Sequence, residues 1–365
     1  MELLEYFHSQ HYSSEKYIPR KLQLPEKGYI NLFGVRGAGK SSMILAHLEE
    51  FDEEERLYID LEDPNLIFGT LNAVTLQHYI DHNEITLLVL DHYEEGRLEE
   101  QLPSVDRLIV ISRIPLDDPK LVPVELFPLD YEEFLAFESS ISATNAFNHF
   151  LKCGTLPALA RSYRSTLLPM KQFWQSHFTP NEQQLLLILA QHHTKHLTVH
   201  QIYTFAKERF RVSKDWLYKT IKAFTEEKLI LFIDDCYQKG GKKMILFDFA
   251  FARYLTTGQP FIIQFDTMIA LALVKHGIDF DTLGIHGYIT KDGELIIPAP
   301  FESEESLWAK SQTKFSLYKQ YGVQKITIVT VANSYEYDIE KLHFEALPFY
   351  EWTVLFEEEE IGDRR

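Results

Sequence analysis

A glycine-rich segment near the start of the chain has the residue types that bind phosphate groups. The segment GVRGAGKSS covers residues 34–42 and fits the P-loop pattern G-x-x-x-x-G-K-[ST]. Glycines let such a loop wrap closely around phosphates, and the helix that follows adds the positive end of its dipole. The lysine, Lys40, would reach the β- and γ-phosphates, and the Ser41 hydroxyl would ligate Mg²⁺. We therefore expect ATP or ADP with Mg²⁺ as the ligands. The predicted cofactor-binding residues are Gly34, Arg36, Gly37, Ala38, Gly39, Lys40, Ser41 and Ser42.

The sequence on either side of this loop predicts the elements that would position it. Residues 28–33 (GYINLF) are rich in β-formers, and residues 42–51 (SMILAHLEEF) have a helical pattern. This is the strand–loop–helix context that the motif requires. The alternative is an ordinary glycine-rich turn between a strand and a helix.

Two further polar residues are predicted to lie at the carboxyl ends of strands, where open α/β sheets bind ligands. Asp91 lies near the end of the apolar run at residues 84–93, and we predict that it is the second Mg²⁺ ligand, the Walker B aspartate. Ser112 lies near the end of residues 106–114 and is predicted to sense the γ-phosphate, while Arg113 more simply forms a surface salt bridge. The alternatives are that Asp91 caps the next segment and that Ser112 is a plain strand-end hydroxyl.

These elements, with the segment ELFPLDYEEFL at residues 125–135, resemble a group of prokaryotic AAA-type ATPases that carry a winged helix and a restriction-endonuclease-like C-terminal domain. Members have an arginine in the P-loop, here Arg36, and a Gly-Gly-x-Pro segment in the lid, matched here by GTLP from Gly154 to Pro157. The resemblance covers most of the first 250 residues. It implies an α/β fold with an AAA-type P-loop parallel sheet, followed by a helical lid, a winged helix and a small α/β domain. The implied domains are residues 1–137 (P-loop ATP-binding), 138–178 (lid), 179–257 (winged helix) and 258–365 (restriction-endonuclease-like).

One departure from the family bears on catalysis. The family continues its Walker B strand as Asp-Glu, and the glutamate polarises the attacking water, whereas this chain has Asp91-His92. A histidine accepts a proton with a different geometry and pKa. We therefore predict nucleotide binding with slow or absent hydrolysis, which describes a nucleotide-dependent switch. Two alternatives stay open: an active ATPase completed by a neighbouring subunit, and a DNA-binding regulator with a vestigial nucleotide site.

The middle of the chain predicts a winged helix. Helical patterns at residues 179–192, 197–210 and 212–230 precede a hairpin whose tip is KGGKK, residues 239–243. Residues 180–257 hold 12 basic and 8 acidic residues, a net charge of +4 in a chain of −18. Double-stranded DNA is therefore a possible partner, although such modules also serve only for packing. The candidate DNA contacts are Lys214, Trp216, Lys219, Lys222, Lys242 and Lys243.

The last segment predicts the β–β–α–β order of a nuclease core without its catalytic residues. We expect a helix over residues 259–280, a hairpin turning at residues 291–293, a helix over 303–321 and a strand over 325–331. A metal-dependent nuclease needs an Asp on one strand and Glu-x-Lys on the next. Neither is present, and Glu294 and Lys310 are not at the needed spacing. We therefore expect this domain to pack or to bind a protein partner, with self-association as one possibility.

Composition excludes several other classes of function. The acidic chain argues against broad, non-specific binding to nucleic acid or membranes. Cys153 and Cys236 are too few for a disulfide framework, and there is no apolar run of membrane-spanning length and no signal-peptide pattern, which favours a cytoplasmic location. Four histidines between residues 192 and 200 are more simply a solvated helix–turn region than a metal site.

Overall fold

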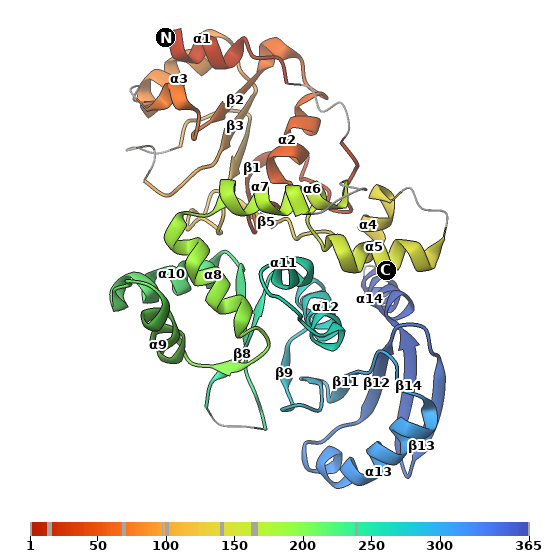
Figure 1. Cartoon of the computed structure of the whole chain (residues 1–365). Helices are drawn as coiled ribbons and strands as arrows, with labels where there is room; N and C mark the ends of the chain where they lie inside the picture. The colour runs from red at the N-terminus through yellow and green to blue at the C-terminus, as the bar shows by residue number, and fades with distance from the viewer. Residues whose placement is uncertain are drawn as a thin grey trace. The chain divides into compact units, whose positions relative to one another are not determined.

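The structure is a computed structural model of the 365-residue chain. It describes residues 2–12, 17–67, 71–96, 98, 102–138, 142–161, 167–237 and 240–363. The chain divides into two compact units. Unit 1 is Met1–Leu129 with Leu156–Ala158, and unit 2 is Asp130–Thr155 with Leu159–Arg365. Figure 1 labels the helices and strands of both units.

Unit 1 contains a five-stranded parallel sheet with the strand order β2-β3-β4-β1-β5. This P-loop-like order confirms the predicted α/β sheet. Its strands are β1 (Gly28–Phe33), β2 (Arg56–Asp60), β3 (Leu87–Asp91), β4 (Arg107–Ile111) and β5 (Val122–Glu125). Every residue of β3 and β4 is buried, as expected for central parallel strands that are covered on both faces.

Alternate residues of these strands form the core of unit 1 with two helices. Leu57, Leu88 and Leu108 point to the same side as Phe7 of α1 (Glu2–His8) and Leu76 of α3 (Ala73–His82), and all of them are buried in one apolar cluster. Figure 1 shows both helices beside β2 and β3. The helix α2 (Lys40–Leu48) follows β1, and two short 3₁₀ turns, Glu53–Glu55 and Pro64–Leu66, flank β2.

The first part of unit 2 is helical and ends in a small antiparallel sheet. Its helices are α4 (Tyr131–Phe137), α5 (Ala143–Cys153), α6 (Pro157–Ala160, which begins in unit 1), α7 (Leu167–His177), α8 (Pro180–Gln191), α9 (Val199–Arg209), α10 (Lys214–Glu226) and α11 (Phe249–Tyr254). The sheet has the order β6-β8-β7, from β6 (His196–Leu197), β7 (Ile230–Ile233) and β8 (Lys242–Leu246).

The three helices and the hairpin predicted from residues 179–246 are therefore present. Side-chain N-caps at Thr179, Thr198 and Ser213 begin α8, α9 and α10, because each accepts a hydrogen bond from a backbone N–H of the first turn. The hairpin tip, predicted at residues 239–243, is shorter than predicted, because β8 begins at Lys242. Lys242 and Lys243 belong to β8, and Lys239 lies outside the described residues.

The second part of unit 2 is a six-stranded mixed sheet with the order β13-β14-β12-β11-β10-β9. Its elements are α12 (Phe261–Lys275), β9 (Phe280–Thr282), β10 (Tyr288–Thr290), β11 (Glu294–Pro298), α13 (Glu304–Gln320), β12 (Lys325–Thr330), β13 (Tyr335–Ile339), β14 (Leu342–Pro348) and α14 (Phe349–Asp363). The predicted helices, hairpin and strand are confirmed, and β11 runs parallel to β12. The elements β9, β13, β14 and α14 were not predicted from the sequence.

The helices of the described residues include none that is long and apolar enough to cross a membrane.

Candidate functional site

The glycine-rich loop connects β1 directly to α2. Gly34 has a φ of 144°, and a Cβ there would lie 2.3 Å from the carbonyl oxygen of Leu126, so no larger residue fits. Gly39, with a φ of 97°, occupies the N-cap position of α2 in the left-handed region that favours glycine. The Lys40 ammonium folds back onto the loop, where it donates to the carbonyl oxygens of Gly34 at 2.6 Å and Val35 at 3.2 Å. The predicted strand–loop–helix arrangement is therefore present.

The strand order brings the other two predicted residues to the same edge of the sheet. β4 lies between β1 and β3, with Leu32 paired to Ile111 and Leu90 paired to Val110. The loop follows β1, Ser112 follows β4, and Asp91 ends β3. Three neighbouring parallel strands thus place their carboxyl-end residues side by side, where ligands of open α/β sheets bind.

Asp91 is fully buried and held by two donors. The Tyr58 hydroxyl donates to its Oδ2 at 2.6 Å, and the backbone N–H of His92 donates to its Oδ1 at 2.7 Å. Burial and then the Asp91 carboxylate raise the pKa of Tyr58, so the phenol keeps its proton and remains a donor. Tyr58 therefore fixes the orientation of the carboxylate.

Ser112 is buried in a small amide–hydroxyl network. Its Oγ donates to the carbonyl oxygen of Ile114 at 2.6 Å and accepts from Nδ2 of Asn31 at 2.8 Å. The Asn31 side chain also donates to the Val110 carbonyl and accepts the N–H of Leu116. Asn31 was not predicted from the sequence, although a lone amide inside the apolar strand GYINLF is a visible signal. The role of Ser112 toward a γ-phosphate stays a prediction.

His92 is turned toward β2, the strand on the far side of β3 from β4 and β1. Its backbone has a φ of 55°, and its Nδ1 lies 2.7 Å from Oδ1 of Asp60 and 3.7 Å from Oδ1 of Asp91. The hydrogen bond to Asp60 raises the pKa of His92, with the charges of Asp91, Asp60 and Glu62 adding to it against the effect of burial. Burial acts to raise the pKa of Asp60, but hydrogen bonds from His92 and from the N–H of Glu62 lower it overall. The pair is therefore an imidazolium–carboxylate ion pair over a wider pH range than two isolated groups would give.

Asp60 was not singled out from the sequence. It pairs in register with Asp91 across two parallel strands. Its place at the end of the strand at residues 56–60 is a signal that could have pointed to it. Arg113 forms the predicted surface ion pair, 3.2 Å from Glu62, with Glu94 at 3.9 Å.

Comparisons with known proteins add no family. No protein-family model matches the chain, and no curated protein does.

The predicted DNA-contact lysines fall into two groups. Lys214, Lys219 and Lys222 are exposed on α10, while Trp216 is half-buried and its ring meets Phe210 edge-on. On β8, Lys242 is half exposed and its ammonium lies 2.8 Å from Oδ2 of Asp234.

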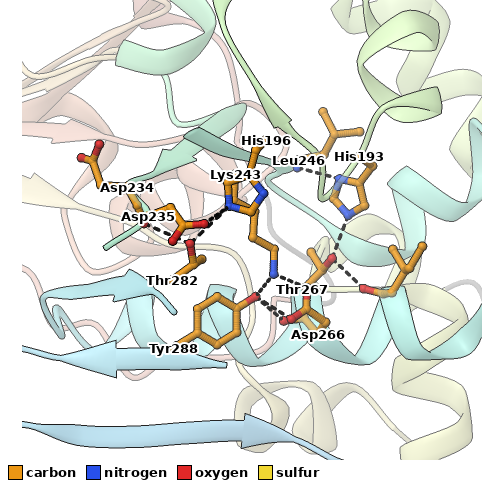
Figure 2. A network of polar contacts seen from close by, with 11 residues as sticks. His193, His196, Asp234, Asp235, Lys243, Leu246, Asp266, Thr267, Thr282 and Tyr288 are labelled. Carbon is orange, nitrogen blue, oxygen red and sulfur yellow. Dashed lines mark hydrogen bonds and ion pairs between the residues drawn. The ribbon is translucent and has the colours of Figure 1, made fainter. Parts of the chain in front are cut away.

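Lys243 is buried, so the prediction that placed it at an exposed hairpin tip was wrong. Figure 2 shows its ammonium between Asp266 of α12 and Tyr288 of β10. The distances from Nζ are 2.7 Å to Oδ2 of Asp266 and 2.8 Å to the Tyr288 hydroxyl. The hydroxyl in turn donates to Oδ1 of Asp266 at 2.8 Å. Every charged atom of this triad is satisfied within unit 2, so Lys243 acts as a link between the hairpin and the mixed sheet.

Two of the clustered histidines belong to the same region (Figure 2). His193 is not solvated as predicted, and His196 is partly buried. His193 is buried, accepts the N–H of Leu246 at Nδ1, and therefore carries its proton on Nε2, 2.7 Å from the Thr267 hydroxyl. Burial and then Lys243 lower the pKa of His193 to about 3, so it is neutral at physiological pH. His196 lies 2.8 Å from Oδ2 of Asp235. Within the described ranges, no three His, Cys, Asp or Glu side chains are arranged to hold a metal ion.

The mixed sheet does not bring Glu294 and Lys310 together. Glu294 lies on β11 with its Oε1 3.6 Å from Lys325 of β12, and Lys310 of α13 lies 2.5 Å from Oε1 of Glu302. Each charge is therefore used in a separate ion pair.

The neighbouring lysines of β8 provide a matched test of the buried link. Lys243→Met leaves Asp266 without its cation, so we expect a loss of about 3 kcal/mol in the free energy of unfolding of unit 2, typical of breaking a buried pair. Lys242→Met breaks only an exposed pair and should cost less than about 1 kcal/mol. Urea unfolding followed by fluorescence measures both. Equal effects of the two substitutions would contradict the structural role of Lys243.

Proposed function

We propose that the protein binds Mg²⁺-ATP or ADP at the carboxyl edge of the five-stranded sheet. The observation that carries the proposal is that the P-loop, Ser112 and Asp91 lie at the carboxyl ends of three hydrogen-bonded neighbours, β1, β4 and β3. The N–H groups of the loop and the start of α2 would bind the phosphates, with Lys40 as their cation. The Ser41 hydroxyl and the Asp91 carboxylate would hold Mg²⁺, which would neutralise charge on the phosphates. The described side chains fit this group, since a hydroxyl and a fixed carboxylate are oxygen donors that Mg²⁺ prefers.

The same geometry supports slow hydrolysis. A general base needs an unprotonated acceptor directed at the attacking water. The residue after Asp91 is His92, whose Nδ1 is engaged by Asp60 on the strand farther from the P-loop and whose raised pKa favours the protonated form. Such an imidazolium cannot accept a proton. We therefore propose that nucleotide occupancy acts as a switch. The resemblance of the sequence to AAA-type ATPases is consistent with nucleotide binding at this loop.

Binding is tested by titrating the parent chain and Lys40→Ala with Mg²⁺-ATP in a calorimeter. We expect micromolar affinity in the parent and its loss in the variant, because Lys40 supplies the cation for the phosphates. Lys120→Ala, which removes an exposed positive charge of the same unit, is the control and should bind like the parent. Absence of binding by the parent would mean that the loop no longer binds nucleotide and would refute the proposal.

Hydrolysis is tested with His92→Glu, which restores the carboxylate of the Asp-Glu pattern. We expect parent turnover well below the roughly 1–100 per second of efficient phosphoryl-transfer enzymes, and a clear increase in the variant. Phosphate release at several protein concentrations is the measurement. Fast turnover by the parent would refute the switch, and a rate per molecule that rises with protein concentration would favour the alternative in which a neighbouring subunit completes the site.

A second candidate function, DNA binding by a winged helix formed by α8–α10 and β6–β8, is supported by the exposed lysines on α10. The third helix of such a module enters the major groove. Among the candidate contacts, Lys222 also lies 3.6 Å from Glu226, and Lys243 is already committed to Asp266. The proposal therefore rests on the α10 lysines and not on the hairpin.

The test replaces the three α10 lysines together. The residues changed to Ala are Lys214, Lys219 and Lys222. We expect weaker binding to duplex DNA and a salt dependence reduced by about 2 to 3 in slope, since each phosphate contact contributes about 0.9. The charge-matched control changes Lys291, Lys319 and Lys341 to Ala. An unchanged slope would exclude this helix as the DNA-contacting surface, and affinity that survives Lys40→Ala would favour a DNA-binding regulator with a vestigial nucleotide site.

A further inference from the structure

We propose that Arg20 is a positioning residue that fixes the P-loop in its phosphate-binding shape, an inference that rests on the proposed function. Arg20 lies in the segment between α1 and β1 and is half-buried. Its guanidinium donates from Nη1 to the carbonyl oxygen of Ala38 at 2.9 Å and from Nη2 to that of Phe127 at 2.7 Å. One side chain thus joins the end of the P-loop to the segment after β5.

The segment after β5 also supports the beginning of the loop. The N–H of Leu126 donates to the carbonyl of Phe33 at 2.8 Å. The Leu126 carbonyl oxygen lies only 2.3 Å from the position that a Cβ on Gly34 would take. Residues 126–127 therefore contact the first glycine of the loop directly and its last turn through Arg20. Residues 126–127 thus connect to both ends of the loop, and the Arg20 side chain makes the connection to its last turn.

The bond to Ala38 has a consequence for the group that would meet a phosphate. A peptide unit is planar and trans, so the N–H of Gly39 points opposite to the carbonyl of Ala38. Arg20 holds that carbonyl on its own side and thereby directs the Gly39 N–H away from itself. Glycine at this position lets the peptide rotate easily, and it has no side chain of its own with which to cap α2. An external anchor such as Arg20 therefore limits the rotation of this peptide and of its donor.

Arginine is suited to this task in a way that lysine is not. A guanidinium is a rigid fork with donors in two directions, whereas an ammonium is a point charge on a flexible stem. The two carbonyl oxygens belong to segments 89 residues apart, Ala38 and Phe127, and the fork joins them at once. If the role is geometric, keeping the charge alone does not restore it.

The experiment compares Arg20→Met and Arg20→Lys with the parent chain and with Lys120→Met, a control that removes an exposed charge from the same unit. Mg²⁺-ATP affinity is measured by calorimetry at fixed ionic strength, and the melting temperature is measured without nucleotide. We expect both Arg20 variants to lose about tenfold or more in affinity, since charged hydrogen bonds are the stronger ones and 1.4 kcal/mol is a factor of ten. The control should bind like the parent, and both Arg20 variants should still unfold cooperatively, so that the loss of affinity is not a loss of the fold.

The outcomes separate this inference from the function on which it rests. Lys40-dependent ATP binding in the parent, with parent-like affinity in Arg20→Met, would overturn the role of Arg20 alone. Parent-like affinity in Arg20→Lys would show that charge and not the fork matters, which also overturns it. If Arg20→Met does not fold, Arg20→Lys decides between the same results. A parent chain that binds no ATP would overturn both the function and this inference.

Discussion

The register between β1, β4 and β3 is the constraint on which the candidate site depends. Parallel pairing sets Leu32 beside Ile111 and Leu90 beside Val110, so the chain leaves all three strands at one edge. A shift of one residue in any of these pairs would turn the side chains of that strand to the other face of the sheet, and the buried apolar set with it. Because both faces of β3 and β4 are buried, such a shift would disrupt the close packing of side chains on both faces. The packing of apolar side chains thus fixes the positions of the polar groups at the carboxyl edge of the sheet.

Placing polar groups at a buried sheet edge has a cost, because a buried donor or acceptor without a partner destabilises the fold. The chain offsets this cost with side chains inside the strands themselves. Tyr58 of β2 bonds Asp91, and Asn31 of β1 bonds Ser112. The residues expected to do chemistry are therefore held by neighbours whose own role is orientation. Arg20 extends the same principle to a backbone carbonyl of the loop.

Much of the first unit could be predicted from the sequence, because its signals are local. The glycine spacing of the loop and the continuous apolar runs of β3 and β4 are visible in a few residues each. The missed strands of the mixed sheet have weaker signals: β9 is only three residues long, and β13 (YEYDI) alternates aromatic and acidic residues at an edge. Side-chain partners were the least predictable feature. Asp60 is 32 residues from His92 and Asp266 is 23 residues from Lys243, and only the folded register brings each pair together.

The difference between Lys243 and the α10 lysines shows why residue type alone does not assign a function. All of them were candidates for DNA contact, as basic side chains in a basic segment. The structure separates them by burial: a lysine that is desolvated beside Asp266 and Tyr288 has its charge neutralised by a fixed partner, whereas the α10 lysines keep theirs in solvent. His92 follows the same logic at the proposed nucleotide-binding edge. The resemblance to AAA-type ATPases places it where a base would stand, but its partner Asp60 engages its Nδ1 in an ion pair, so the partner limits the chemistry that the residue can perform.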